Sequence, residues 1–249
     1  MGDLIPPQFI ARSDGTRLAY RRRQGSAPGL VFLPGYMSDM QGGKAIAFDA
    51  WAEARGRACL RFDYAGCGES AGAFEAETLS TWLGDTLLMI DALTDGPLVL
   101  VGSSMGGWLA LLAAIARPER VAGMIGIAAA PDFTDWGFTQ EQKLEILSNG
   151  RLVERSPYGP EPTITTRGFW QSGEANRLLQ GPVAIDCPVR LIHGQRDPDV
   201  PWHHSPHLAS LIRSDDVQVT LVKDGDHRLS REQDIALLLR TAQDLVERL

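Results

Sequence analysis

The stretch LVLVGSSMGGW, residues 98–108, runs from an apolar segment directly into a cluster of small residues. The segment PLVLV is continuously apolar, which is typical of a strand buried on both faces. The residues after Ser104, MGGWLALLAAIARPER, have the pattern of a helix, and Pro118 disfavours helical geometry at Arg117 before it. The stretch therefore predicts a strand, a sharp turn and a helix in direct succession.

Two adjacent serines lie in that turn, and only one of them fits the spacing G-x-S-x-G. Gly102 and Gly106 flank Ser104 at this spacing, whereas Ser103 has a valine and a methionine at the corresponding positions. At a nucleophile elbow the chain reverses so sharply that the flanking side chains must be nearly absent. The serine hydroxyl then projects at the positive end of the following helix. The pattern favours Ser104 as a nucleophile, and a purely structural turn is the alternative.

The rest of the chain alternates short apolar runs with helical patterns. Runs with strand character are GLVFLPGY (29–36), ACLRFDY (58–64), PLVLVGSS (97–104), VAGMIGIAAA (121–130), CPVRLIHG (187–194) and VQVTLV (217–222). Helical patterns cover residues 40–55, 77–93, 104–117 and the C-terminal segment from residue 231. Short apolar strands between helices indicate a mostly parallel sheet with helices on both faces. We expect residues 17–23 to form an early antiparallel strand at the edge of this α/β fold.

Residues 131–181 interrupt this alternation. The segment has no strand-like run, is rich in Pro, Gly and polar residues, and contains six aromatic residues: Phe133, Trp136, Phe138, Tyr158, Phe169 and Trp170. A disordered insertion would be poor in aromatic residues, so we expect a small, mostly helical cap inserted after the sixth strand. The core is then 1–130 and 182–249. The cap aromatics favour a substrate with an apolar acyl group or aglycone; packing of these rings onto the core is the alternative.

Composition and charge exclude several classes of protein. The net charge of −7 argues against a nucleic-acid-binding protein, which would present a basic face. The one basic run, Arg21–Arg23, lies in the strand expected over residues 17–23. We interpret it as the solvated side of an edge strand, where charge discourages pairing with another chain.

The cysteines and the N-terminal stretch bear on the cellular compartment. Cys59, Cys67 and Cys187 form no C-x-x-C or metal-like spacing, which is typical of free thiols in a reducing compartment. MGDLIPPQFIARSDG lacks the charged-then-apolar layout of a secretory signal, and Pro6 stands where a myristoylation signal has Ser or Thr. The longest apolar run, 121–130, is too short to cross a bilayer. We therefore expect a cytoplasmic protein without a membrane span.

A serine nucleophile needs a base, and the base needs an acid to orient it. On α/β folds with this elbow, the acid and then the base follow the serine along the chain. Asp197 lies in the loop after the apolar strand CPVRLI, at the sheet edge where parallel strands present ligands. Asp199 lies two residues further on. Spacing alone leaves both carboxylates as candidates for the acid.

Five histidines are candidates for the base. His193 precedes the acid and ends a strand, which favours support of a turn. His203, His204 and His207 lie at the start of the next helix; the pair 203 and 207 could ligate a metal but lacks an acidic or thiol partner nearby. His227, in KDGDHRLS between the last strand and the last helix, is the candidate base. A buried structural histidine is the alternative at that position.

Several motifs together resemble one family. They are FLPGY (32–36), RFDYAGCGES (61–70), VGSSMGG (101–107), HGQRDPDVPW (193–202) and GDHR (225–228). This set is similar to the hallmarks of the α/β-hydrolase superfamily. With PGYMSDMQGGKA (34–45) and AAIARPE (113–119), the chain resembles more closely the mitochondrial-type serine hydrolases described as acyl-protein thioesterases (depalmitoylases) and acyl-glucuronide esterases.

The resemblance has implications for the site. It implies that Asp197, the acid of the D-x-x-V-P pattern, is the triad acid rather than Asp199. It also implies an oxyanion hole formed by the backbone N–H groups of Tyr36 and Met105. Many relatives have His-Gly where this chain has Pro34-Gly35, but the donor is the amide one position later.

The leading hypothesis is a serine hydrolase that cleaves carboxylic esters or thioesters through an acyl-enzyme. Ser104, His227 and Asp197 would act as nucleophile, base and acid, and the chemistry needs no metal and no organic cofactor. One alternative is a small-molecule carboxylesterase or lactonase with no protein substrate. Another is a ligand-binding or sensor protein that retains the hydrolase fold.

Overall fold

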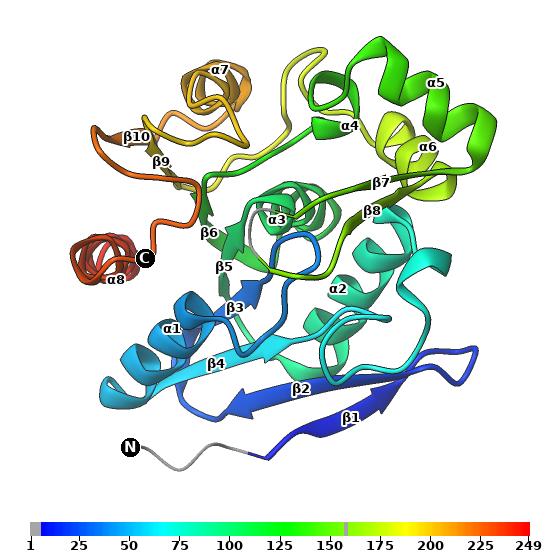
Figure 1. The fold of residues 1–249 in the computed structure, drawn as a ribbon. Helices are drawn as coiled ribbons and strands as arrows, with labels where there is room; N and C mark the ends of the chain where they lie inside the picture. The colour runs from blue at the N-terminus through cyan, green and yellow to red at the C-terminus, as the bar shows by residue number, and fades with distance from the viewer. Residues whose placement is uncertain (1–5, 157–158) are drawn as a thin grey trace.

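An eight-stranded sheet lies at the centre of the computed structural model, which describes residues 6–156 and 159–249 (Figure 1). The strands are β1 (Gln8–Ala11), β2 (Arg17–Arg23), β3 (Ser26–Leu33), β4 (Arg57–Phe62), β5 (Leu98–Ser103), β6 (Val121–Ile127), β9 (Val189–Gly194) and β10 (Val217–Val222). Their order is β1-β2-β4-β3-β5-β6-β9-β10. β2 pairs antiparallel with β1 and β4, and all other pairs are parallel. This is the mostly parallel sheet that the apolar runs predict.

Helices cover both faces of the sheet, as Figure 1 shows. One face carries α2 (Leu79–Leu93), α3 (Met105–Ala116) and α7 (His204–Leu211), whose buried side chains belong to the larger apolar cluster. The other carries α1 (Gly43–Ala54) and α8 (Glu232–Val246). α8, in the C-terminal segment with the predicted helical pattern, packs on this second face, where Leu238, Ala242 and Leu245 are fully buried. A short 3₁₀ turn, η1 (Phe74–Ala76), precedes α2.

The segment between β6 and β9 contains α4 (Phe133–Trp136), α5 (Gln140–Asn149), β7 (Arg151–Glu154), β8 (Thr163–Thr166) and α6 (Arg167–Ala175). β7 and β8 pair as an antiparallel two-stranded sheet, so the expectation of a segment without strands is wrong. Each strand has only four residues, too few for an alternating pattern to be distinguished from a loop. In Figure 1 the segment lies beyond one end of the sheet, next to α2 and α3.

The basic run of β2 does not lie at a solvated edge, which corrects the sequence-based interpretation. β1 is the edge strand, and β2 lies between β1 and β4. Arg21 is 5 % exposed and pairs with Glu69 at 2.5 Å. Arg23 binds Asp49 at 2.9 Å, as well as a second acid of α1. A charge run cannot be distinguished from a buried ion-paired row in the sequence, because the acids that neutralise it lie elsewhere in the chain.

The contact between β5 and α3 requires glycine. A Cβ on Gly102 would lie 2.3 Å from the carbonyl oxygen of Gly106, and a Cβ on Gly106 would lie 2.1 Å from that of Leu33. Both contacts are with backbone, which cannot move aside as a flexible side chain can. The glycines of the G-x-S-x-G pattern therefore let the helix begin directly against the sheet.

We predict that Gly106→Ala lowers the free energy of unfolding by about 2–3 kcal/mol, because the added methyl group overlaps the backbone of β3. The matched control is Gly84→Ala. Gly84 lies exposed within α2 with no atom near its Cβ position, so the same substitution should stabilise by about 0.5–1 kcal/mol. Urea unfolding measures both values. Equal effects of the two substitutions would contradict the close approach.

Candidate active site

Ser104 lies at the junction of β5 and α3 with a strained backbone. Its φ is 55° and its ψ is −121°, a conformation that residues other than glycine rarely adopt. Backbone hydrogen bonds hold it there: its N–H donates to the carbonyl of Ile127 (2.9 Å), and its own carbonyl accepts from Ala130 (3.1 Å). Because strain of this kind persists only where the surroundings enforce it, the junction has the form of a nucleophile elbow. The neighbouring Ser103 ends β5 and is buried.

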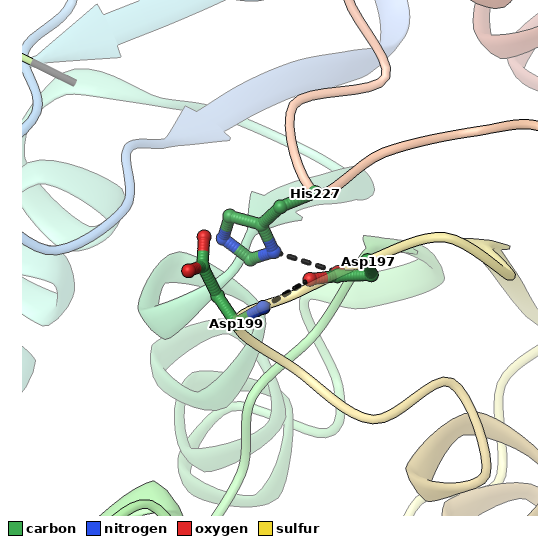
Figure 2. Close-up of side chains that lie close together, drawn as sticks. All are labelled: Asp197, Asp199 and His227. Atoms are coloured by element: carbon green, nitrogen blue, oxygen red, sulfur yellow. Dashed lines mark hydrogen bonds and ion pairs between the residues drawn. The ribbon is translucent and has the colours of Figure 1, made fainter. Parts of the chain in front are cut away.

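The structure brings together the three side chains that the sequence singles out for catalysis. The Oγ of Ser104 lies 3.1 Å from Nε2 of His227. The Nδ1 of the same ring lies 2.7 Å from Oδ2 of Asp197 (Figure 2). The Asp197 carboxylate is fully buried, and the His227 side chain is 15 % exposed. A hydroxyl, an imidazole and a carboxylate thus form one continuous hydrogen-bonded chain.

Two glycines bring the acid and histidine loops into contact. Asp197 follows β9, and His227 lies between β10 and α8. A Cβ on Gly194 would lie 2.3 Å from the carbonyl oxygen of Gly225. The same carbonyl accepts a hydrogen bond from the N–H of Arg196 (2.9 Å). Only a glycine at the end of β9 allows this approach, which places the carboxylate within reach of the imidazole.

The Asp197 carboxylate is saturated with hydrogen bonds. Oδ1 accepts the backbone N–H groups of Asp199 (2.8 Å) and Val200 (2.9 Å), and Oδ2 accepts from His227 and His193. Burial opposes ionisation of Asp197, but the hydrogen bonds from the two histidines outweigh it, so its pKa is lowered from the ordinary value of 3.8. The group therefore stays ionised throughout the neutral range.

Asp199 donates its backbone N–H to Asp197, and its exposed carboxylate lies beside the ring of His227 (Figure 2). Side-chain oxygens of both aspartates and a ring nitrogen of His227 lie within 4.8 Å of one another, close enough to hold a cation. However, four donors already occupy the acceptor positions of Asp197. This arrangement fits an acid that orients an imidazole and does not fit a metal ligand.

The loop from Pro34 to Tyr36 lies against the serine. A Cβ on Gly35 would lie 3.3 Å from Cβ of Ser104 and 4.0 Å from its Oγ. Within the part of the chain that the structure describes, neither the N–H of Tyr36 nor that of Met105 donates a hydrogen bond. Met105 follows Ser104 directly and Tyr36 follows Gly35, so both amides are candidate donors to an oxyanion formed at the serine.

The Tyr36 side chain ties this loop to the segment between β6 and β9. Its hydroxyl donates to the carbonyl of Ile164 in β8 at 2.5 Å. Its ring contacts Phe133 and Phe169 of that segment, with ring centres 5.9 and 4.8 Å apart, and also Trp82 of the core. The residue that carries a candidate oxyanion amide is therefore also a main aromatic contact between the large sheet domain and the segment between β6 and β9.

A cavity of about 590 Å³ opens at Ser104, which is within the usual size range for small-molecule sites. The segment between β6 and β9 contributes lining residues Ser156, Gly159, Pro160, Glu161 and Thr163. The loop after β3 and α1 also contribute lining residues, and the rest of the wall includes Asp199, His227 and Arg228. The described lining is mixed in polarity rather than aromatic.

The aromatic residues of the segment pack onto the core, which was the alternative to a role in binding. Phe133 contacts Trp108, and Trp136 stacks on His204. Among the described residues, none of the six aromatics predicted for the cap lines the cavity at Ser104. Tyr158 lies outside the described residues. The sequence-based argument for an apolar substrate therefore loses its support, because these rings serve packing.

Two further residues make contacts at the site that the sequence analysis did not predict. Lys44 of α1 lines the cavity and donates from Nζ to the carbonyl of Arg228, next to His227. Burial and the nearby Arg228 charge lower the pKa of Lys44 to about 8. His193 contacts Asp197 directly. The contact of Lys44 joins two segments that are distant in the sequence, and the contact of His193 depends on how one loop folds back. Spacing along the chain therefore reveals neither contact.

Comparison with known proteins settles the family. The sequence profile described as alpha/beta hydrolase fold matches residues 28–151. The palmitoyl-protein thioesterase ABHD10, mitochondrial, from Homo sapiens is 44 % identical over 245 residues, covering 97 % of this chain and 80 % of the relative. The chain belongs to the ABHD10 family of α/β hydrolases.

Solved structures agree with this assignment. The alpha/beta hydrolase domain-containing protein 10 from mouse superposes with a TM-score of 0.92 and 42 % identity, covering 98 % of this chain and 99 % of that one. A putative hydrolase from Agrobacterium vitis S4 gives a TM-score of 0.90 and 39 % identity, covering 97 % and 99 %. The predicted α/β-hydrolase fold is confirmed, and the chain is a hydrolase of the ester and thioester class.

The comparisons correct the expected compartment. The ABHD10 relatives from five mammals are all named mitochondrial, so the prediction of a cytoplasmic protein is wrong. Free cysteines indicate a reducing environment but do not distinguish one reducing compartment from another. Separately, none of the helices in the described ranges is both long and apolar enough to span a membrane.

The lowered pKa of Asp197 makes a prediction about stability and pH. Because its folded pKa lies below the unfolded value of about 4, its ionised form stabilises the fold above that pH, and this contribution is lost as pH falls further. The stability deficit of Asp197→Asn should therefore be largest near pH 7 and shrink below pH 4. Urea unfolding at several pH values measures it. Asp199→Asn is the control and should show a smaller deficit at pH 7; a deficit of Asp197→Asn that grows on acidification would contradict the argument.

Proposed function

We propose that the protein hydrolyses esters or thioesters through an acyl-enzyme on Ser104. The observation that carries this proposal is the unbroken chain from Ser104 Oγ through His227 to Asp197, with links of 3.1 and 2.7 Å. A serine hydroxyl is a weak nucleophile unless a base accepts its proton during attack. Nε2 of His227 lies at the distance that this transfer requires.

In the first half-reaction, Oγ of Ser104 attacks the substrate carbonyl carbon while His227 takes its proton. The negative charge on the carbonyl oxygen is stabilised by the N–H groups of Tyr36 and Met105. Loss of one such donor typically costs about 3 kcal/mol of transition-state stabilisation. Collapse of the tetrahedral intermediate expels the thiolate or alkoxide, which receives the proton from His227. Asp197 holds the ring in the tautomer that leaves Nε2 as the acceptor at the start.

In the second half-reaction, His227 takes a proton from water, and the resulting nucleophile attacks the acyl-serine. The carboxylic acid leaves, and the proton returns to Ser104 through His227. Every proton transfer passes through Nε2 of His227, which alternates between base and acid.

Long-chain acyl thioesters are our first choice of substrate. The ABHD10 relatives are named palmitoyl-protein thioesterases and match nearly the whole of this chain. The cavity at Ser104 and a second one of about 440 Å³ share Met37, Ser38, Asp39 and Glu161 as lining, so the two cavities are neighbours. A second candidate, a small-molecule carboxylesterase, is favoured by the polar residues that the described cavity wall contains.

A fluorophosphonate probe tests the chemistry. We expect one probe to attach per protein molecule, at Ser104, with labelling abolished in Ser104→Ala and retained in Ser103→Ala. Ser103 is the matched control because it is adjacent, buried and also lines the cavity. Intact-mass measurement reads the result. A folded protein that does not react would favour a ligand-binding role over hydrolysis.

Acyl specificity separates the two substrate classes. We expect kcat/KM for acyl thioesters to rise with chain length up to about 16 carbons, by about 15-fold per two added methylene groups at most, since each buried CH₂ contributes about 0.8 kcal/mol. Ser104→Ala measures the uncatalysed background. A steep preference for acetyl or butyryl esters over long thioesters would exclude the thioesterase and support the small-molecule esterase.

A further inference from the structure

His193 is a second imidazole at the acid of the site. It lies near the end of β9, four residues before Asp197, and is fully buried. Its Nε2 lies 3.1 Å from Oδ2 of Asp197 and 3.0 Å from the carbonyl oxygen of Val200. The side chain therefore does more than support the turn after the strand: it touches the same carboxylate oxygen as His227.

The partners of His193 determine which nitrogen carries hydrogen. Oδ2 of Asp197 and the carbonyl of Val200 can only accept, so Nε2 must be the donor. Its Nδ1 lies 2.7 Å from Oγ of Ser205, a hydroxyl that can donate to the other ring nitrogen. Ser205 is itself buried at the start of α7. Both ring nitrogens are thus satisfied, and the ring is locked in one orientation.

The two oxygens of Asp197 are held differently. Oδ1 is fixed by backbone N–H groups, which any residue except proline would supply at positions 199 and 200. Oδ2 lies between two imidazoles, His227 at 2.7 Å and His193 at 3.1 Å. Oδ2 is also the oxygen that orients His227. The hydrogen bond from His193 therefore acts on the one acceptor whose direction and charge the base depends on.

We propose that His193 is a positioning residue of the catalytic site, which donates from Nε2 to Oδ2 of Asp197 and so aims the carboxylate at His227 and limits its basicity. The inference rests on the proposed function, because it assigns His193 a role through the Asp197–His227 pair. Without this donor, more of the negative charge on Oδ2 would face His227, and the imidazolium form would be favoured.

Other charged groups border the two histidines and stay unchanged in the test. Lys44 of α1 and Arg228 lie on the cavity side of His227, and Asp199 lies beside its ring. On the other side, the histidines of α7 interact electrostatically with one another, and His204 also with His193. Because the variants below alter none of these groups, a shift in the pH profile reports the contact between His193 and Asp197.

Two amide variants provide the experiment. Gln places its side-chain nitrogen at about the reach of Nε2, whereas Asn places it near Nδ1, short of Asp197. In His193→Asn we expect kcat/KM at pH 7 to fall about tenfold. The rising limb of the plot of kcat/KM against pH should move to higher pH by about 0.5 to 1 pH unit. His193→Gln should keep kcat/KM within about twofold of the unmodified protein, with an unmoved limb. Ser205→Ala, which leaves the donor to Asp197 in place, should also leave the limb unmoved.

Equal pH profiles for His193→Asn and His193→Gln would overturn the proposal, since a merely structural role does not distinguish the two amides by pH. If the variants do not fold, the unmodified protein provides the test. Nitrogen NMR of the imidazoles should place a hydrogen on Nε2 of His193, and a hydrogen on Nδ1 alone would also overturn the proposal. Failure of the proposed function is recognised separately, because Ser104→Ala would then retain activity.

Discussion

The strained backbone of Ser104 is the constraint on which the rest of the site depends. A residue with positive φ can project its hydroxyl from the end of β5 only if the helix begins at once. That requirement leaves no space for side chains at Gly102 and Gly106. Two backbone hydrogen bonds, to the end of β6 and to the loop after it, hold Ser104 in this strained conformation. One local distortion thus accounts for both the glycine pattern and the exposure of the nucleophile.

The parallel sheet then brings the other groups to the same edge. The loops after β3, β5, β9 and β10 carry Tyr36, Ser104, Asp197 and His227, respectively, because parallel strands all end on one side. Tyr36 adds a connection that the sheet itself does not provide: its hydroxyl and ring hold β8 and α6 over the site. The wall that the segment between β6 and β9 contributes to the cavity therefore depends on the same loop that presents a candidate oxyanion amide.

Most of the strands, the long helices and Ser104 could be predicted because each depends on local pattern, whereas Asp197 was distinguished from Asp199 only by the family resemblance. Continuous apolar runs identify buried strands, and only the spacing of two glycines distinguishes Ser104 from Ser103. The failures concern partners distant in sequence. The acids that pair with Arg21 and Arg23 lie in other segments of the chain. The β7–β8 hairpin is too short to show a periodic pattern. The aromatic residues between β6 and β9 pack inward onto Trp82 and Trp108. His193 falls between these cases, since its place at the end of a strand was predicted but its contact with Asp197 was not.

Direct capture of the intermediate is the sharpest test of acyl transfer at Ser104. The protein is mixed with a palmitoyl thioester, quenched in acid within milliseconds to seconds, digested and examined by mass spectrometry. We expect the palmitoyl mass on the peptide that contains Ser104, appearing before free fatty acid and absent from Ser104→Ala. Turnover with the acyl group on another peptide, such as that of Cys67, or with no acylated peptide at any time, would contradict it.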